Sequence, residues 1–173
     1  MLLSEMQDST DYKLYCDLDG VLADFEAILD RVMSEKYSQH EYETDSKYRT
    51  KMWKMIHEYQ KAGGELWYEL PQLEAGKLWK HIKGHKPEIL SATGDPVHKA
   101  EKQKHRWVAK HLGSDVTINL TRKAADKAKY ADKQHILIDD KQKAIGPWVA
   151  AGGIGILHTS ASDTIKQLAK YGL

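Results

Sequence analysis

Short apolar segments alternate along this chain with longer segments of helical periodicity, and this alternation constrains the fold more than any other feature. The apolar segments are residues 13–16, 88–91, 116–120, 136–138 and 155–157. Between most of them lie segments with apolar side chains at helical spacing, of which residues 99–112 are the longest. Strands that alternate with helices are typical of a parallel sheet covered by helices. We therefore expect an α/β fold with a five-stranded parallel sheet and helices on both of its faces.

One connection is much longer than the others. About 70 residues, mostly of helical periodicity, separate Cys16 from Glu88, far more than one crossover between parallel strands needs. We therefore expect residues 37–71 to form a helical cap inserted between the first two strands. Residues 1–36 and 72–173 are then expected to form one α/β domain.

Composition excludes several classes of protein. The 173 residues include 26 Lys and Arg against 25 Asp and Glu, so the formal charge is +1. A protein that coats nucleic acid or an anionic membrane needs a large basic surplus, which this chain lacks. Apolar residues make up 41% of the chain, too many for a disordered protein. Cys16 is the only cysteine, which excludes an intramolecular disulfide framework and a cysteine-based zinc site.

The sequence also predicts a compartment. The first ten residues, MLLSEMQDST, lack the basic and apolar regions of a signal peptide. No segment approaches the roughly 20 apolar residues that span a bilayer. We therefore expect a cytoplasmic protein without a membrane partner, in which Cys16 is a buried, unreactive thiol.

Two pairs of acidic residues follow apolar segments. Asp17 and Asp19 follow the first, and Asp139 and Asp140 follow the fourth. In an open parallel sheet, ligands bind beyond the carboxyl ends of the strands, so we expect these carboxylates to converge there. Converging carboxylates repel one another unless a cation lies among them, and oxygen ligands favour Mg²⁺ over zinc. Gly20 permits the tight turn that brings backbone close to a ligand.

The second apolar segment ends in small polar residues. The hydroxyl groups of Ser91 and Thr93, with backbone N–H groups from Ala92 to Gly94, are candidates for binding phosphate oxygens. A lysine from residues 123–129 could supply the cation that balances a phosphoryl group during its transfer.

Four motifs in this order resemble those of the haloacid dehalogenase (HAD) superfamily of phosphohydrolases. They are DLDGVLADFE at residues 17–26, EILSATGD at 88–95, DKAKYA at 126–131 and HILIDD at 135–140. The chain resembles in particular the 5'(3')-deoxyribonucleotidases and related small phage and bacterial nucleotidases. Two further segments, ELWYEL at 65–70 and EKQKHRWVAKHLG at 101–113, support this resemblance. It implies a Rossmann-like HAD fold and hydrolysis of phosphate monoesters.

The resemblance also implies roles for individual residues. Asp17 would be the nucleophile that becomes an aspartyl phosphate, and Asp19 the general acid and base. Mg²⁺ would be held by the carboxylate of Asp17, the backbone carbonyl of Asp19 and Asp140, with Asp139 in support. Ser91 would bind the phosphate.

The same resemblance leaves the phosphate-neutralising lysine open between two positions. Lys127 matches the local Asp-Lys pattern and is preferred, whereas counting back from the acidic pair selects Lys129. Phe25, Trp67 and Tyr68 would border the site for the base and the sugar. The implied substrates are deoxynucleoside or nucleoside 5'-monophosphates, with nucleic acid involved only as the end of a substrate.

Two alternatives stay open at this point. A phosphatase for polynucleotide 3' ends or for small sugar phosphates would share all four motifs and differ only in the cap. A receiver-like signalling domain, or an inactive phosphate-binding relative, would also gather acidic residues and a lysine at the ends of parallel strands. Other basic residues have simpler interpretations. We expect the cations of residues 99–110 to form a solvated helix face, and we expect His81 and His85 not to form a metal site.

Overall fold

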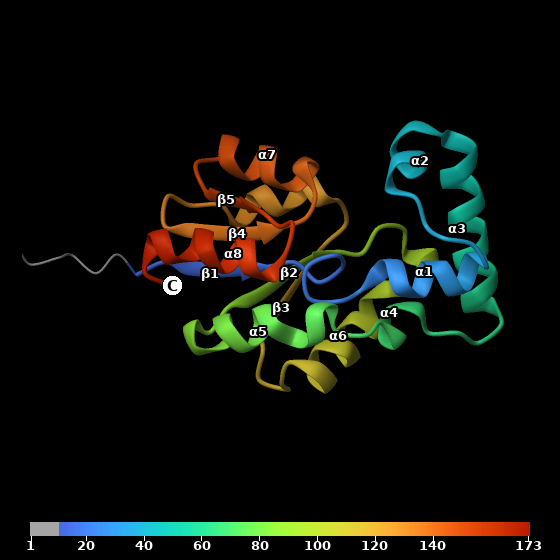
Figure 1. The fold of residues 1–173 in the computed structure, drawn as a ribbon, viewed down its shortest axis with the longest axis horizontal. Helices are drawn as coiled ribbons and strands as arrows, with labels where there is room; N and C mark the ends of the chain where they lie inside the picture. The colour runs from blue at the N-terminus through green and yellow to red at the C-terminus, as the bar shows by residue number, and fades with distance from the viewer. Residues whose placement is uncertain (1–10) are drawn as a thin grey trace, which may run out of the picture.

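A computed structural model describes residues 11–173, and it confirms the predicted fold class (Figure 1). The five strands are β1 (Lys13–Cys16), β2 (Glu88–Ala92), β3 (Ile118–Thr121), β4 (His135–Asp139) and β5 (Ile154–Leu157). All neighbouring strands pair in parallel, in the order β3-β2-β1-β4-β5. Receiver domains have the order 2-1-3-4-5, so this topology disfavours the receiver alternative. The expectation about a signal peptide concerns residues 1–10, which lie outside the described residues.

Alternation along the strands divides the core between the two faces of the sheet. Leu14 and Cys16 of β1 belong to one apolar cluster, whereas Tyr15 between them belongs to the other. Successive side chains of a strand point to opposite faces, which accounts for this division. The first face is covered by α5 (Lys77–Ile82), α6 (Ala100–His111) and α8 (Ala161–Leu168). The second face is covered by α7 (Gln142–Ala150) and the 3-10 segment η4 (Ala124–Tyr130).

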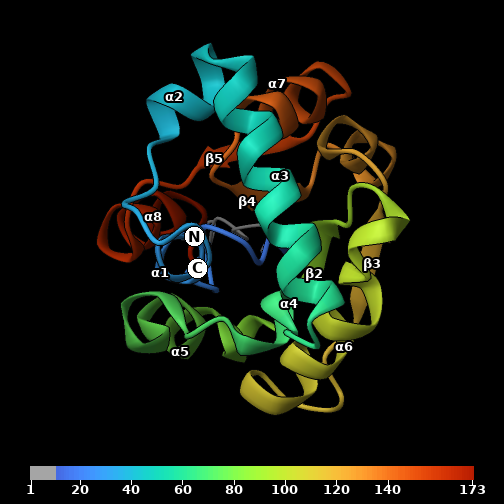
Figure 2. The ribbon, with the colours of Figure 1, turned by 90° about the vertical axis from the view of Figure 1, so that its right-hand side faces the viewer.

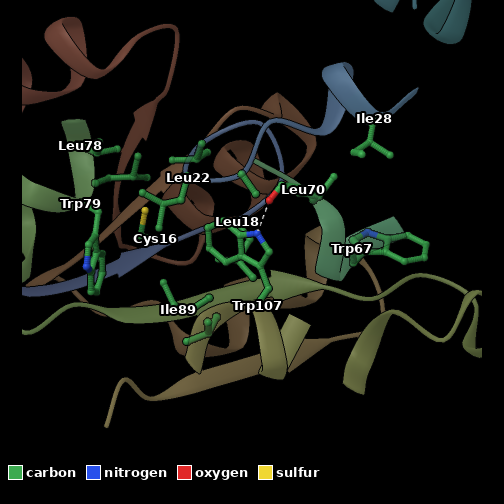
Figure 3. Packing of buried hydrophobic residues seen from close by; sticks show 14 of the residues in the cluster. Cys16, Leu18, Leu22, Ile28, Trp67, Leu70, Leu78, Trp79, Ile89 and Trp107 are labelled. Atoms are coloured by element: carbon green, nitrogen blue, oxygen red, sulfur yellow. Dashed lines mark hydrogen bonds between the residues drawn. The ribbon is translucent and has the colours of Figure 1, made fainter. Parts of the chain in front are cut away.

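The larger apolar cluster joins the sheet to α5 and α6, and it also includes Trp67 and Leu70 (Figure 3). Trp107 of α6 is buried, and its indole N–H donates a 2.7 Å hydrogen bond to the carbonyl of Leu70. Cys16 is fully buried, and this burial raises the pKa of its thiol well above the ordinary value. The prediction of a buried cysteine is therefore confirmed.

The long connection between β1 and β2 contains four helices before α5. They are α1 (Phe25–Met33), α2 (Gln39–Thr44), α3 (Ser46–Lys61) and α4 (Leu66–Glu69). Asp24 caps α1 by accepting a hydrogen bond from the N–H of Ala27, as such a residue does at a helix N-terminus. Helix α3 packs against α1 and α2. Figures 1 and 2 show α2 and α3 beyond the end of the sheet toward which β1 runs.

Short 3-10 segments complete the described chain. They are η1 (Leu73–Gly76), η2 (Lys83–His85), η3 (Pro96–His98) and η5 (Ala169–Tyr171). Within residues 11–173, the structure contains no helix with the length and apolar character needed to cross a membrane.

Candidate active site

The two acidic pairs meet at the carboxyl ends of the two central strands. Asp17 directly follows β1, Asp139 ends β4, and the N–H of Asp17 donates a 2.9 Å hydrogen bond to the carbonyl of Ile138. Strands β2 and β3 lie on one side of β1, whereas β4 and β5 lie on the other. The chain therefore reverses its direction of winding between β1 and β4, the place where open α/β sheets bind ligands. A cavity of about 520 Å³ opens there.

Three carboxylates form the floor of this cavity. Asp17, Asp139 and Asp140 each offer an oxygen, and these oxygens lie within 4.8 Å of one another. Asp19 also lines the cavity, and its carboxylate accepts a hydrogen bond from Lys104. The sequence correctly predicted that these four side chains converge. It gave Asp139 only a supporting place, whereas the structure places it in the group of three.

Lys127 enters the site from η4. Its Nζ atom lies 3.1 Å from Oδ1 of Asp17 and 2.5 Å from Oδ2 of Asp139, and the side chain is only 1% exposed. Asp17 and Asp139 share the parity of Tyr15 and Leu137, so their side chains face the side of the sheet that η4 covers. Lys129 is exposed. Of the two lysines, the structure therefore brings only Lys127 into the site.

A second buried lysine was missed by the sequence analysis. Lys104 of α6 is 1% exposed, and its Nζ atom donates hydrogen bonds to Oδ2 of Asp19 at 2.8 Å and to Oγ of Ser91 at 2.8 Å. The expectation that all cations of residues 99–110 are solvated is therefore wrong at this position. Lys104 stands three and four residues before Trp107 and Val108, which places it on the buried stripe of the helix. The helical spacing of Lys104 relative to these apolar residues could therefore have indicated from the sequence that it is buried.

Charges in the site control one another's ionisation. Burial alone would raise the pKa of Asp17, but Lys127 and Lys104 outweigh it and lower that pKa below the ordinary value. Burial and the charge of Asp17 raise the pKa of Asp139 to about 7 and that of Asp140 to about 6. Asp17 is therefore the carboxylate that stays ionised, whereas the other two resist ionisation.

The phosphate-binding groups predicted after β2 are only partly available. Ser91 is buried beside Asp17 and Lys104, and Ala92 and Thr93 line the cavity. The N–H of Thr93 donates to the carbonyl of Thr121 at the end of β3, and the N–H of Gly94 donates to the carbonyl of Arg122, the residue after β3. The hydroxyl of Thr93 also donates to Thr121. The N–H groups of Thr93 and Gly94 are therefore already paired within the protein, and a role for them in binding phosphate stays a prediction.

The three predicted aromatic residues separate in the structure. Phe25 and Trp67 line the cavity, although Trp67 is only 4% exposed and belongs mainly to the core. Tyr68 does not line it; its ring lies under the guanidinium of Arg106 at 4.0 Å and near the ammonium of Lys110 at 4.8 Å. Tyr68 is directed away from the cavity that Trp67 lines, because adjacent residues of a helix face different directions.

Several further residues line the cavity that the sequence analysis did not assign to the site. The connection between β1 and β2 contributes the aromatic side chains of Tyr37, Tyr42 and Trp53. The α/β domain contributes cations, which are Arg122, Lys123, Lys141 and Lys143. The cavity therefore has an acidic floor, an aromatic wall and a basic margin.

The acidic floor is suited to a divalent cation. Oδ1 of Asp140 is buried and accepts no hydrogen bond from the described part of the chain. Buried acceptors without partners cost free energy unless something binds them. Three oxygens within 4.8 Å of one another match the hard oxygen ligands that Mg²⁺ prefers.

Comparisons with solved structures find similar folds. A hydrolase from Streptococcus pneumoniae TIGR4 is similar over 92% of this chain and 99% of its own, with a TM-score of 0.56 and 15% identity. A Had-superfamily hydrolase from Ehrlichia chaffeensis covers 93% of this chain and 97% of its own, with a TM-score of 0.48 and 13% identity. A HAD hydrolase of family IA, variant 3, from Entamoeba histolytica HM-1:IMSS covers 92% and 88%, with a TM-score of 0.45 and 14% identity.

The likeness to the Streptococcus pneumoniae hydrolase shows a shared fold across nearly the whole length of both chains. At this level of identity, it is the fold that is shared. No family model and no curated protein matches the sequence.

Proposed function

We propose that this protein is a Mg²⁺-dependent phosphomonoesterase of the HAD superfamily that hydrolyses deoxynucleoside or nucleoside 5'-monophosphates. The observation that carries this proposal is the environment of Asp17. It is a carboxylate with a lowered pKa on the floor of a cavity, with Lys127 at 3.1 Å and the Ser91–Lys104 pair beside it. An ionised carboxylate beside ammonium groups that lower its pKa is suited to attack phosphorus, and the ammonium group of Lys127 offsets the charge of the phosphate. The fold shared with a hydrolase supports the reaction class.

The reaction proceeds in two steps through an aspartyl phosphate. In the first step, a carboxylate oxygen of Asp17 bonds to phosphorus while the bond from phosphorus to the ester oxygen breaks. Asp19 donates a proton to that departing oxygen. In the second step, Asp19 accepts a proton from water, whose oxygen bonds to phosphorus and releases Asp17. Asp19 thus ends each cycle protonated, as it began, with a proton taken from water in place of the one that left with the alcohol.

Asp17 and Asp140 would hold Mg²⁺, with Asp139 in support. When bound, the ion neutralises phosphate oxygens and offsets the repulsion among the three carboxylates. Lys127 holds Asp139 at 2.5 Å, so this carboxylate is oriented by the protein itself. Gly20 leaves the space in which the carboxylate of Asp140 lies.

Cavity size and lining support a nucleotide as the substrate. A volume of about 520 Å³ lies in the range of small-molecule sites, roughly 300–1,000 Å³. Phe25 and the aromatic wall offer faces on which a nucleobase stacks. The basic margin attracts an anion. Residues 37–71 act as the cap that shields the aspartyl phosphate from bulk water.

The test is phosphate release from 5'- and 3'-mononucleotides, sugar phosphates and a 3'-phosphorylated oligonucleotide, each with Mg²⁺ and with EDTA. We expect Mg²⁺-dependent turnover of one class of mononucleotide and none by Asp17→Asn. Turnover of only the oligonucleotide or the sugar phosphates would support the proposed phosphomonoesterase reaction and contradict the proposed substrate. No turnover of any ester by folded protein would contradict the proposed function.

A further inference from the structure

Lys104 is a buried cation whose hydrogen-bonding capacity is fully used. Its Nζ atom donates to Oδ2 of Asp19 at 2.8 Å, to Oγ of Ser91 at 2.8 Å and to the carbonyl of Ala92 at 2.7 Å. An ammonium group has three N–H donors, so each donor has one acceptor. We propose that Lys104 is the positioning residue of the general acid and base, fixing the carboxylate of Asp19 so that Oδ1 alone exchanges the proton. This inference rests on the proposed function.

Burial of Lys104 is not explained by stability. An ammonium group loses several kcal/mol when it leaves water, and an apolar residue of similar volume at such a position is often neutral or stabilising. Trp107, one turn along the same face of α6, shows that this stripe accepts large apolar side chains. Lys127 already provides the cation closest to Asp17. A role for Lys104 at Asp19 accounts for its presence on the stripe.

Contacts of Asp19 give its two oxygens different roles. Oδ2 accepts the hydrogen bond from Lys104, whereas Oδ1 is buried and has no hydrogen-bond partner among residues 11–173. A carboxylate is free to rotate about its terminal bond unless one oxygen is held. With Oδ2 held, Oδ1 is the oxygen that donates the proton to the leaving group and takes it from water. Ser91 accepts from Lys104, and its own O–H is left to donate to Asp17 beside it.

Helix α6 is held in place on both sides of Lys104. The side-chain oxygen of Gln103 accepts a 3.0 Å hydrogen bond from the N–H of Trp67, and its amide donates at 3.0 Å to Gln60 of α3. Trp107 donates to the carbonyl of Leu70, the dashed contact in Figure 3. The helix that carries Lys104 is thus fixed to α3, to α4 and to the residue that follows α4.

The experiment compares two esters whose leaving groups differ in their need for a proton. A nucleoside 5'-monophosphate releases an alkoxide, which needs the proton, whereas para-nitrophenyl phosphate releases a stable anion. The ratio kcat/KM reports the steps up to departure of the leaving group. We expect Lys104→Met to lower kcat/KM for the nucleotide about 100-fold and that for para-nitrophenyl phosphate less than about 10-fold. Lys102→Met, at an exposed position of the same helix, is the matched control and should leave both unchanged.

A double-mutant cycle separates positioning from a general structural effect. If Lys104 acts through Asp19, adding Lys104→Met to Asp19→Asn should change kcat/KM for the nucleotide less than about 2-fold. The double variant removes both charges of the Lys104–Asp19 pair, so neither charge is left buried without its partner. If Lys104→Met does not fold, Lys104→Gln replaces it. Equal losses on both esters, or a full further loss in the Asp19→Asn background, would overturn the proposal. A wild-type protein that hydrolyses neither ester would instead overturn the proposed function and this inference with it.

Discussion

Gly20 and Asp140 lie so close together that no side chain fits between them. A Cβ atom on Gly20 would lie 2.5 Å from Oδ2 of Asp140, closer than Cβ atoms come to any neighbour. Gly20 also has a φ of +79°, a left-handed conformation that only glycine adopts without cost. The turn after β1 therefore shapes the position of an acidic residue that follows β4.

Replacing Gly20 with alanine should displace the carboxylate of Asp140. We expect Gly20→Ala to weaken Mg²⁺ binding and to lower kcat at least about 10-fold, since loss of a well-placed charged group costs that much or more. The measurement is turnover as a function of Mg²⁺ concentration. Gly152→Ala is the matched control, because Gly152 has a φ of +96° and no atom within 4 Å of a Cβ. Similar Mg²⁺ dependence in both variants would show that strain alone explains the effect.

Lys127 and Lys129 should differ sharply in their effect on turnover. We expect Lys127→Met to lower kcat about 10²–10³-fold, the usual loss when a group that stabilises a charged transition state is removed. Lys129→Met should leave kcat within about 2-fold of the wild type, because Lys129 is exposed and Lys127 is buried against Asp17 and Asp139. Phosphate release by the two variants, after circular dichroism has shown that both fold, decides between them. Loss of turnover in Lys129→Met alone would reverse the assignment.

Stability without metal should depend on pH in a defined direction. The pKa of Asp139 is raised to about 7 and that of Asp140 to about 6, from an ordinary value of 3.8. Between about pH 4 and 7, the folded protein therefore binds protons that the unfolded chain has lost. The free energy of unfolding falls as pH rises through this window. Mg²⁺ favours the ionised carboxylates, so it should stabilise the protein more at pH 7.5 than at pH 5.

Thermal unfolding at both pH values, with EDTA and with Mg²⁺, checks this expectation. For a chain of this length, 1 kcal/mol shifts Tm by roughly 2–4 °C, so a difference of a few degrees is measurable. Asp140→Asn should reduce both the pH dependence and the effect of Mg²⁺. A shift in Tm by Mg²⁺ that is equal at the two pH values would contradict the proposed metal site.

Substitutions of Phe25 and Tyr68 should differ in their effect on KM. Phe25 lines the cavity, whereas Tyr68 packs under Arg106. Stacking of a base on an aromatic ring contributes about 1–3 kcal/mol. We therefore expect Phe25→Leu to raise KM for a nucleoside monophosphate about 10-fold and Tyr68→Leu to leave it unchanged. An unchanged KM in Phe25→Leu would place the base elsewhere in the cavity.

Much of the fold and part of the site could be predicted because strand polarity determines them. Each short apolar segment became a strand, and residues that directly follow parallel strands must lie at the same edge of the sheet. This reasoning brought Asp17, Asp139 and Asp140 together and placed Ser91 beside them.

The rest depends on packing that no local pattern contains. Helical spacing places Lys104 on the buried stripe of α6, but only the docking of this helix against β2 shows that its ammonium reaches Ser91. The sequence does not show that the last residue of β3 and the residue after it accept the N–H groups of Thr93 and Gly94. Tyr68 and Trp67 are adjacent, and the orientation of the short helix α4 decides which of them faces the cavity.

The most direct test of the central claim is to detect the aspartyl phosphate itself. Asp19→Asn should slow hydrolysis of the intermediate, so this variant is mixed with a substrate that needs no proton, such as para-nitrophenyl phosphate, in the presence of Mg²⁺. After acid quenching and proteolysis, mass spectrometry should find a phosphoryl group on the peptide that contains Asp17, and none in the double variant with Asp17→Asn. Turnover by the wild type without phosphorylation of Asp17, or with phosphorylation of another residue, would contradict the account.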